Sequence, residues 1–154
     1  MEKEITITRL FDASRERVWK AWTDPERLSQ WWGPRGVTNP VCEVDPRVGG
    51  AVHIVMLAGK ELGALAGQRW PMQGTFLEVV EPERLDFENN AVAEDGTVML
   101  EGETTVVLED MGGKTRLTLT TRAKGMVPQA PQMLEGMEAG WTQSIDKLGE
   151  LLAH

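Results

Sequence analysis

A chain of 154 residues with 41% hydrophobic and 26% charged side chains has the composition of one ordinary globular domain, expected here over residues 1–154. Sixteen basic and twenty-four acidic side chains give a net charge of −8, which argues against nucleic acid and anionic membrane surfaces as partners. Because there is a single cysteine, Cys42, and only two histidines, neither a disulfide nor a common zinc site is expected, and no cofactor is implied. The sequence shows no signal peptide and no long apolar run, which favours a cytoplasmic protein without membrane insertion.

The first elements expected along the chain are one strand and two short helices. In Glu2–Arg9 isoleucines alternate with threonines, as is typical of a half-buried strand. Asp12 or Ser14 can cap the first helix, and Asp24 followed by Pro25 can begin the second. The two helices carry four of the six tryptophans on their apolar sides: Trp19, Trp22, Trp31 and Trp32.

Beyond these helices the hydrophobic pattern changes to period two. Strands are predicted near Val37–Asp45, Ala51–Ala58, Arg69–Val80, Arg84–Asn90, Val98–Glu109 and Thr115–Ala123. Short turns join most of them, which indicates an antiparallel meander. Two connections are longer: Gly59–Gln68, rich in glycine and alanine, and Gly125–Pro131, rich in proline and glutamine.

The chain ends in one long helix, predicted over Gln132–Leu152, whose apolar residues form a single stripe. A single amphipathic helix needs a partner surface, and the only large one is the concave face of the sheet. The sequence therefore predicts an α+β fold. It comprises a strongly curved antiparallel sheet of six to seven strands, two short helices after the first strand, and one long C-terminal helix across the concave face.

Short motifs in a fixed order carry a family resemblance over nearly the whole chain. They are Arg9–Phe11, Val18-Trp19 with Trp22, Asp24-Pro25, Trp31–Pro34, Asp45 with Arg47 and Gly49-Gly50, Gly74, Pro82 with Arg84-Leu85, and Gly136-Met137 followed by Gly140-Trp141. On these motifs the chain resembles the START-like (SRPBCC, helix-grip) superfamily, and within it the activator of heat-shock-protein-90 ATPase homologues. Ser14 stands where that family often has proline. The resemblance implies a cavity between the sheet and the C-terminal helix, which in many members binds lipids, polyketides or other hydrophobic molecules.

The residues expected to line this cavity share one parity along each strand or one side of a helix. They are Trp32, Val52, Ile54, Met56, Trp70, Met72, Phe76, Phe87, Leu117, Leu119, Met137, Trp141 and Ile145. Ile5, Ile7 and Leu85 have the same parity, and the connections Gly59–Gln68 and Gly125–Pro131 are expected to form the mouth. An empty cavity of about 300 Å³ would cost about 7 kcal/mol, so the space is either occupied or smaller.

Each candidate residue also has a purely structural interpretation. The tryptophans of the small helices can wedge those helices against the sheet, and methionines are common core residues. His53 is expected to face outward, and Asp45 with Arg47 to form an ion pair that fixes a turn. No nucleophile–base pair is visible, so no catalytic residue is assigned.

Three functions follow from the sequence. The favoured one is binding of a small hydrophobic molecule that resembles a lipid, a polyketide or an aromatic compound. The first alternative is interaction with a chaperone, as in the eukaryotic activators that the family resembles. The second is a cyclase- or hydrolase-type enzyme that uses the same cavity, which would need a polar side chain pointing inward. Whether the protein is a monomer or a homodimer is left open.

Overall fold

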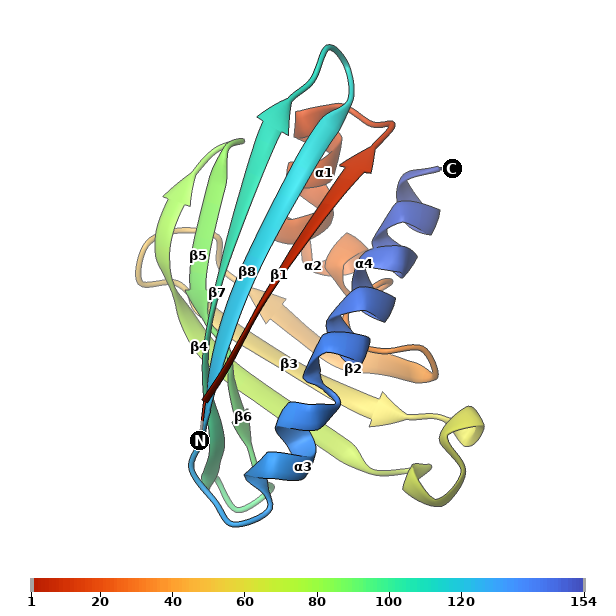
Figure 1. Cartoon of the computed structure of the whole chain (residues 1–154), viewed down its shortest axis with the longest axis vertical. Coiled ribbons are helices and arrows are strands. Elements are labelled where there is room, and N and C mark those ends of the chain that lie inside the picture. Colours follow the sequence, from red (N-terminus) through yellow and green to blue (C-terminus); the bar gives the residue numbers. More distant parts are fainter. Residues whose placement is uncertain (1, 154) are drawn as a thin grey trace.

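A computed structural model describes residues 2–153, which form one curved antiparallel sheet with helices on its concave side (Figure 1). The strands are β1 (Glu2–Phe11), β2 (Val37–Val44), β3 (Ala51–Ala58), β4 (Arg69–Val80), β5 (Arg84–Glu88), β6 (Asn90–Val92), β7 (Val98–Asp110) and β8 (Thr115–Gly125). The helices are α1 (Arg15–Thr23), α2 (Pro25–Leu28), the 3-10 helix η1 (Lys60–Leu65), α3 (Ala130–Glu135) and α4 (Met137–Leu152). The predicted α+β helix-grip fold is confirmed.

The strands follow the order β1-β8-β7-β5-β4-β3-β2, and the short β6 pairs with β4 and β7 beside this path. Each strand from β2 onward pairs antiparallel with its sequence neighbour, apart from the detour around β6, as a meander requires. Helices α1 and α2 carry the chain from the edge strand β1 to the opposite edge strand β2. The sheet is therefore open between its two edges, and α4 lies across that opening (Figure 1).

The sheet has eight strands rather than the six to seven predicted, because the run predicted over Arg84–Asn90 divides at Asn89 into β5 and β6. Glycines on both neighbouring strands let the backbone bend there. A Cβ at Gly74 of β4 would lie 1.7 Å from the Glu88 carbonyl oxygen, and one at Gly102 of β7 would lie 2.5 Å from that of Asn89. Side chains at these positions would prevent the close approach.

The turn between β2 and β3 depends on backbone geometry, as predicted. Arg47 Nε lies 2.7 Å from Asp45 Oδ2, so the two side chains form an exposed ion pair. Gly49 has a φ of +83°, and a Cβ at Gly50 would lie 1.9 Å from the Asp45 carbonyl oxygen. Asp45 and Arg47 therefore form an ion pair within a turn whose backbone geometry requires the two glycines.

The caps of the two short helices also match the sequence. Ser14 Oγ accepts a hydrogen bond from the Arg17 backbone N–H at 3.3 Å, and Asp24 Oδ1 accepts one from that of Glu26 at 3.1 Å. Because two helices this short are marginal alone, their stability comes from burial of their apolar sides against the sheet. The four tryptophans that follow or belong to them are at most 6% exposed: Trp19, Trp22, Trp31 and Trp32.

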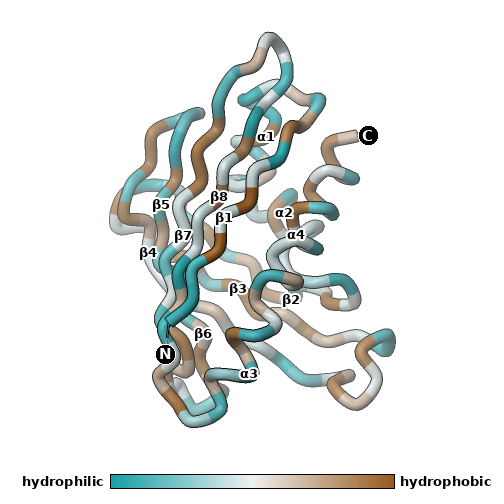
Figure 2. The backbone as a smooth tube through the Cα atoms, in the orientation of Figure 1, coloured by the Kyte–Doolittle hydropathy of each residue, from teal (hydrophilic) through white to brown (hydrophobic). Residues whose placement is uncertain are grey.

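The single C-terminal helix that the sequence predicted is in fact two helices, α3 and α4, which join at Gly136. Glycine is about 1 kcal/mol less favourable than alanine inside a helix, which makes this position a natural break. The buried residues of α4 all lie from Ser144 onward: Ser144, Ile145, Leu148 and Leu152. Figure 2 shows the alternation of hydrophobic and hydrophilic residues along the strands that face this helix. Within residues 2–153 no helix is long and apolar enough to cross a membrane.

Candidate functional site

An apolar cavity of about 10 Å³ lies in the core where the concave face of the sheet meets α1 and α2. Nine side chains line it: Trp22, Leu28, Trp32, Val44, Val52, Ile54, Phe76, Leu85 and Phe87. All of them except Val44 are at most 6% exposed. The volume is at the lower limit for a single water molecule. The interior is therefore packed nearly shut, far below the roughly 300 Å³ considered from the sequence.

Aromatic rings connect the walls of this cavity to the C-terminal helix. The ring centre of Trp22 lies 4.6 Å from that of Trp31, 6.3 Å from that of Phe87 and 6.5 Å from that of Trp32. Trp32 in turn meets Trp141 of α4 edge-on, with 5.2 Å between ring centres. Edge-to-face pairs at these separations are favourable beyond the apolar area that they bury. A displacement of Trp32 would therefore also displace Trp141 of α4.

Trp22 carries a buried donor without an acceptor. Its side chain is 2% exposed, and within the described part of the chain its indole Nε1 finds no hydrogen-bond partner. Leaving a buried polar group unpaired costs roughly 1–3 kcal/mol. Three other indoles do have acceptors: Trp19 donates to Glu81 Oε1 at 3.1 Å, Trp31 to the Ala21 carbonyl at 2.9 Å, and Trp70 to Gln68 Oε1 at 3.2 Å.

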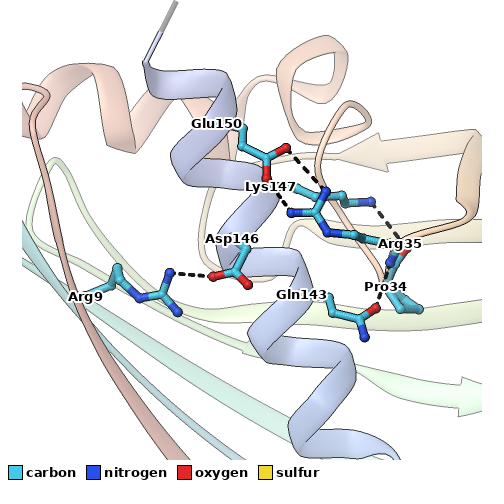
Figure 3. A network of polar contacts seen from close by, with 7 residues as sticks. All are labelled: Arg9, Pro34, Arg35, Gln143, Asp146, Lys147 and Glu150. Carbon is cyan, nitrogen blue, oxygen red and sulfur yellow. Dashed lines mark hydrogen bonds and ion pairs between the residues drawn. The ribbon is translucent and has the colours of Figure 1, made fainter.

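On one side, helix α4 is held to the edge strand β1 and to α1. Arg9 Nη1 of β1 donates to Asp146 Oδ1 at 2.6 Å, and these side chains are 34% and 40% exposed (Figure 3). Arg17 of α1 donates to the Leu152 carbonyl oxygen at 2.9 Å, which satisfies one of the free carbonyls at the helix end. Both contacts fall in the C-terminal half of α4.

On its other side, α4 is held by the loop that precedes β2 (Figure 3). The guanidinium of Arg35 pairs with the Glu150 carboxylate through two nitrogens, and the Arg35 backbone N–H donates to Gln143 Oε1 at 2.9 Å. Lys147 Nζ donates to the Pro34 carbonyl at 3.3 Å. The hydrogen bond from Arg35 lowers the pKa of Glu150, whereas burial lowers the pKa of Lys147. Polar contacts from both edges of the sheet thus fix α4 over the opening.

Comparison with known proteins shows to which family this fold and sequence belong. The family model described as activator of Hsp90 ATPase homolog 1-like protein matches residues 12–153. The chain belongs to this family. Among curated proteins, none matches the chain closely enough to be called a relative.

Solved structures of several bacterial proteins are similar over nearly the whole chain. A protein from Chromobacterium violaceum is 30% identical, with 97% of this chain and 96% of that chain covered and a TM-score of 0.78. A protein from Arthrobacter aurescens is 28% identical, with 97% and 86% covered and a TM-score of 0.80. The AHSA1 protein of Silicibacter pomeroyi is 27% identical, with 98% of each chain covered and a TM-score of 0.78. The resemblance proposed from the sequence is confirmed.

The residues predicted to line a cavity fall into three groups in this member of the activator-like family. Those that line the small cavity are Trp32, Val52, Ile54, Phe76 and Phe87. Those that pack in the core around it are Met56, Met72, Leu117, Leu119, Trp141 and Ile145. Trp70 and Met137 are only half-buried and lie outside that core. The assignment of these residues as a binding site stays a prediction.

Three cavity-lining residues were not among those predicted: Trp22, Leu28 and Val44. The signals for two of them were present in the sequence. Leu28 stands four residues before Trp32, so the two share one side of a helical segment. Val44 lies directly opposite Val52 in the β2–β3 pair, a register that the intervening turn could have indicated. Nothing in the sequence showed that the Trp22 indole lacks an acceptor.

A larger depression, about 510 Å³ in volume, lies on the outer face of the sheet where β5 passes into β6. It is lined by Glu2, Glu88, Asn90, Val98, Glu101, Gly102, Glu103, Arg122, Ala123 and Lys124. Asp86 lies on the same face, between the inward-facing Leu85 and Phe87. Burial, and next the neighbouring Glu103, raise the pKa of Asp86 to about 6. Carboxylates thus gather on the outer face and not around the core cavity.

Two other side chains with possible chemistry are His53 and Cys42, and neither lines the core cavity. His53 faces outward as predicted, with Nδ1 3.4 Å from Glu43 Oε1. Burial raises the pKa of the Cys42 thiol to about 11, so almost none of it is thiolate at neutral pH. Among residues 2–153, no group of three or more His, Cys, Asp or Glu side chains is arranged to hold a metal ion.

Proposed function

We propose that this activator-like protein binds a small hydrophobic molecule at the cavity beside Trp22, where the concave face of the sheet meets α1 and α2, and that α4 moves to make room for it. The observation that carries the proposal is this cavity itself, which has aromatic and aliphatic walls and lies at the meeting point of the sheet with α1 and α2. Ligand sites in proteins are mostly apolar, with few polar groups placed among them. The lining matches that description, with the Trp22 indole as a polar group.

Binding requires the cavity to grow. A permanently open space of about 300 Å³ would cost about 7 kcal/mol, comparable to the whole stability of a domain, about 5–15 kcal/mol. A binding protein of this size therefore gains stability by keeping the space closed until a ligand fills it. The first turns of α4, before Gln143, are the part best able to move, since the buried residues and the contacts to Arg9 and Arg35 lie from Gln143 onward.

Native mass spectrometry of the purified protein, together with quenching of tryptophan emission by a panel of fatty acids and flat aromatic compounds, tests the proposal. We expect a bound mass or saturable quenching with at least one compound class. The variant Val52→Phe places a ring in the space that a ligand would need and should abolish the response, whereas Val80→Phe, at a residue 42% exposed, should leave it unchanged. Apo mass alone with no quenching, or equal loss in both variants, would contradict the proposal.

Interaction with a chaperone is a second candidate, favoured by the family to which the chain belongs. Its net charge of −8 suits docking to a basic surface. Addition of the protein to a cognate heat-shock-protein-90 chaperone should then raise the ATPase rate. An unchanged rate at saturating protein would remove this candidate. The enzyme alternative has no support from the core cavity, because no carboxylate, histidine or hydroxyl group lines it.

A further inference from the structure

The unpaired indole N–H of Trp22 suggests which chemical class of ligand fits the cavity. We infer that the ligand is a neutral, flat, mostly apolar molecule whose carbonyl or ether oxygen accepts a hydrogen bond from Trp22 Nε1. This inference rests on the proposed function and makes it more specific. Buried side-chain donors nearly always have a partner, so an unpaired one beside an apolar cavity calls for an explanation.

Trp22 lines the cavity, and its indole Nε1 is buried and has no hydrogen-bond partner among the described residues. The rings of Trp31, Trp32 and Phe87 pack around the indole, with centres at 4.6, 6.5 and 6.3 Å. The side chain is 2% exposed, so bulk water does not reach it. A single water in the cavity would also be poorly held, because a buried water needs two to four polar partners and the lining is otherwise almost wholly apolar.

The lining also determines the charge of the ligand. No lysine, arginine or histidine is among the nine side chains around the cavity. A carboxylate or phosphate placed there would lose its hydration and gain only neutral donors, which makes an anion unfavourable. A carbonyl or ether oxygen needs one donor only. Flat rings suit walls made by Trp22, Trp32, Phe76 and Phe87, because aromatic pairs are favourable both edge-on and stacked offset.

Room for such a molecule can come from a movement of Trp32 against α4. Trp32 lines the cavity and contacts Trp141, which is only half-buried. The neighbouring Gly140 has open space beside it, because a Cβ there would meet no heavy atom within 4 Å. Trp141 can therefore shift outward together with Trp32 while Ile145 and Leu148 remain packed in the core.

A matched pair of probes tests the inference: 1-indanone, which carries a ketone, and indane, the same ring system without oxygen. Titration of the ¹⁵N-labelled protein followed by NMR gives both dissociation constants and the shift of the Trp22 indole proton. We expect 1-indanone to move this resonance downfield and indane to leave it without a hydrogen-bond shift. In Trp22→Phe the preference for the ketone over the hydrocarbon should fall about tenfold, which corresponds to about 1.4 kcal/mol.

Trp19→Phe is the matched control, because Trp19 donates to Glu81 and does not line the cavity; its preference should stay that of the natural protein. Equal affinity for both probes in the natural protein, with both bound at the cavity, would overturn the inference and leave the proposed function standing. No binding of either probe would count against both. An upfield Trp22 indole resonance that neither probe moves would mean that the N–H is satisfied by the face of Trp31. The chemical shift of the Trp22 indole proton is measured in the unaltered chain, so it tests the inference even if Trp22→Phe does not fold.

Discussion

The two faces of the sheet differ in how their polar side chains are satisfied. On the outer face, acidic and basic side chains pair across strands, as Glu109 does with Arg116 at 2.9 Å. A depression of about 510 Å³ also lies there, and charged side chains line it. On the inner face the side chains are apolar or satisfied, as in the hydrogen bond of 2.8 Å between the Thr104 and Thr121 hydroxyls. The Trp22 indole is the exception that we identify there.

The comparison of the two faces shows that volume alone does not identify a ligand site. The outer depression has about 510 Å³ but is open and carries charges that water already solvates. The inner cavity has about 10 Å³, yet a hydrogen bond made there avoids competition with water and recovers the cost of an unpaired donor. For this reason the proposed ligand site is the inner cavity, where each contact would have the larger effect on free energy.

The largest expected contrast between the faces comes from the same substitution made on each. Leu117→Ala, at a residue fully buried on β8, should lower the free energy of unfolding by about 2–5 kcal/mol because it leaves a cavity. Leu77→Ala, at a residue 44% exposed on β4, should change it by less than about 0.5 kcal/mol. Urea denaturation followed by circular dichroism measures both. Similar losses in the two variants would mean that the outer face is covered by a partner or a second copy.

A smaller contrast separates two tryptophans of the same core. Trp31→Phe and Trp22→Phe remove similar volumes from fully buried positions, but only Trp31 gives up a hydrogen bond, to the Ala21 carbonyl. We expect Trp31→Phe to be the more destabilising by about 1 kcal/mol, measured in the same denaturation assay. Should Trp22→Phe prove as costly as Trp31→Phe, its indole would not be unpaired.

An effect of similar size, confined to one pH range, is expected from Asp86 on the outer face. Its pKa in the folded protein, about 6, lies above the ordinary value of 3.8, so the folded state holds the proton more tightly than the unfolded state. Stability from this group is present below about pH 4 and decreases as the pH rises to about 6. Asp86→Asn should therefore stabilise the protein at pH 7, by on the order of 1 kcal/mol after allowance for solvent screening, and have little effect at pH 4.

Thermal unfolding at the two pH values measures this effect. Glu101→Gln removes a carboxylate from the same outer face and serves as the charge-matched control. A stabilisation by Asp86→Asn that is equal at pH 4 and pH 7 would contradict the account, because it would then come from the side-chain amide and not from the loss of a buried charge.

Local patterns explain why most of the fold could be predicted. The strands Ala51–Ala58 and Arg69–Val80 begin and end where the sequence analysis placed them, because period-two alternation and flanking turn residues both act locally. The division at Asn89 could not be predicted in the same way. It depends on how closely the backbones of Gly74 and Gly102 approach from neighbouring strands, which is a tertiary contact.

The candidate site could likewise be predicted only in part from local sequence patterns. Parity along the strands correctly indicates which residues face inward, such as Ile54 and Leu117, but not how far each lies from the cavity. Ile54 lines the cavity and Leu117 does not, because β3 and β8 are separated by three other strands of the same sheet. The unpaired N–H of Trp22 is a property of three-dimensional packing, and no sequence pattern reports it.

The most direct test of interior binding is a crystal structure of the protein grown with a saturating concentration of 1-indanone. We expect density for the ligand between Trp22, Phe87 and Trp32, with the ketone oxygen within about 3 Å of Trp22 Nε1 and with Trp141 displaced outward. Density for the ligand in the outer depression beside Arg122 and Lys124, with the core cavity still closed, would contradict the central claim.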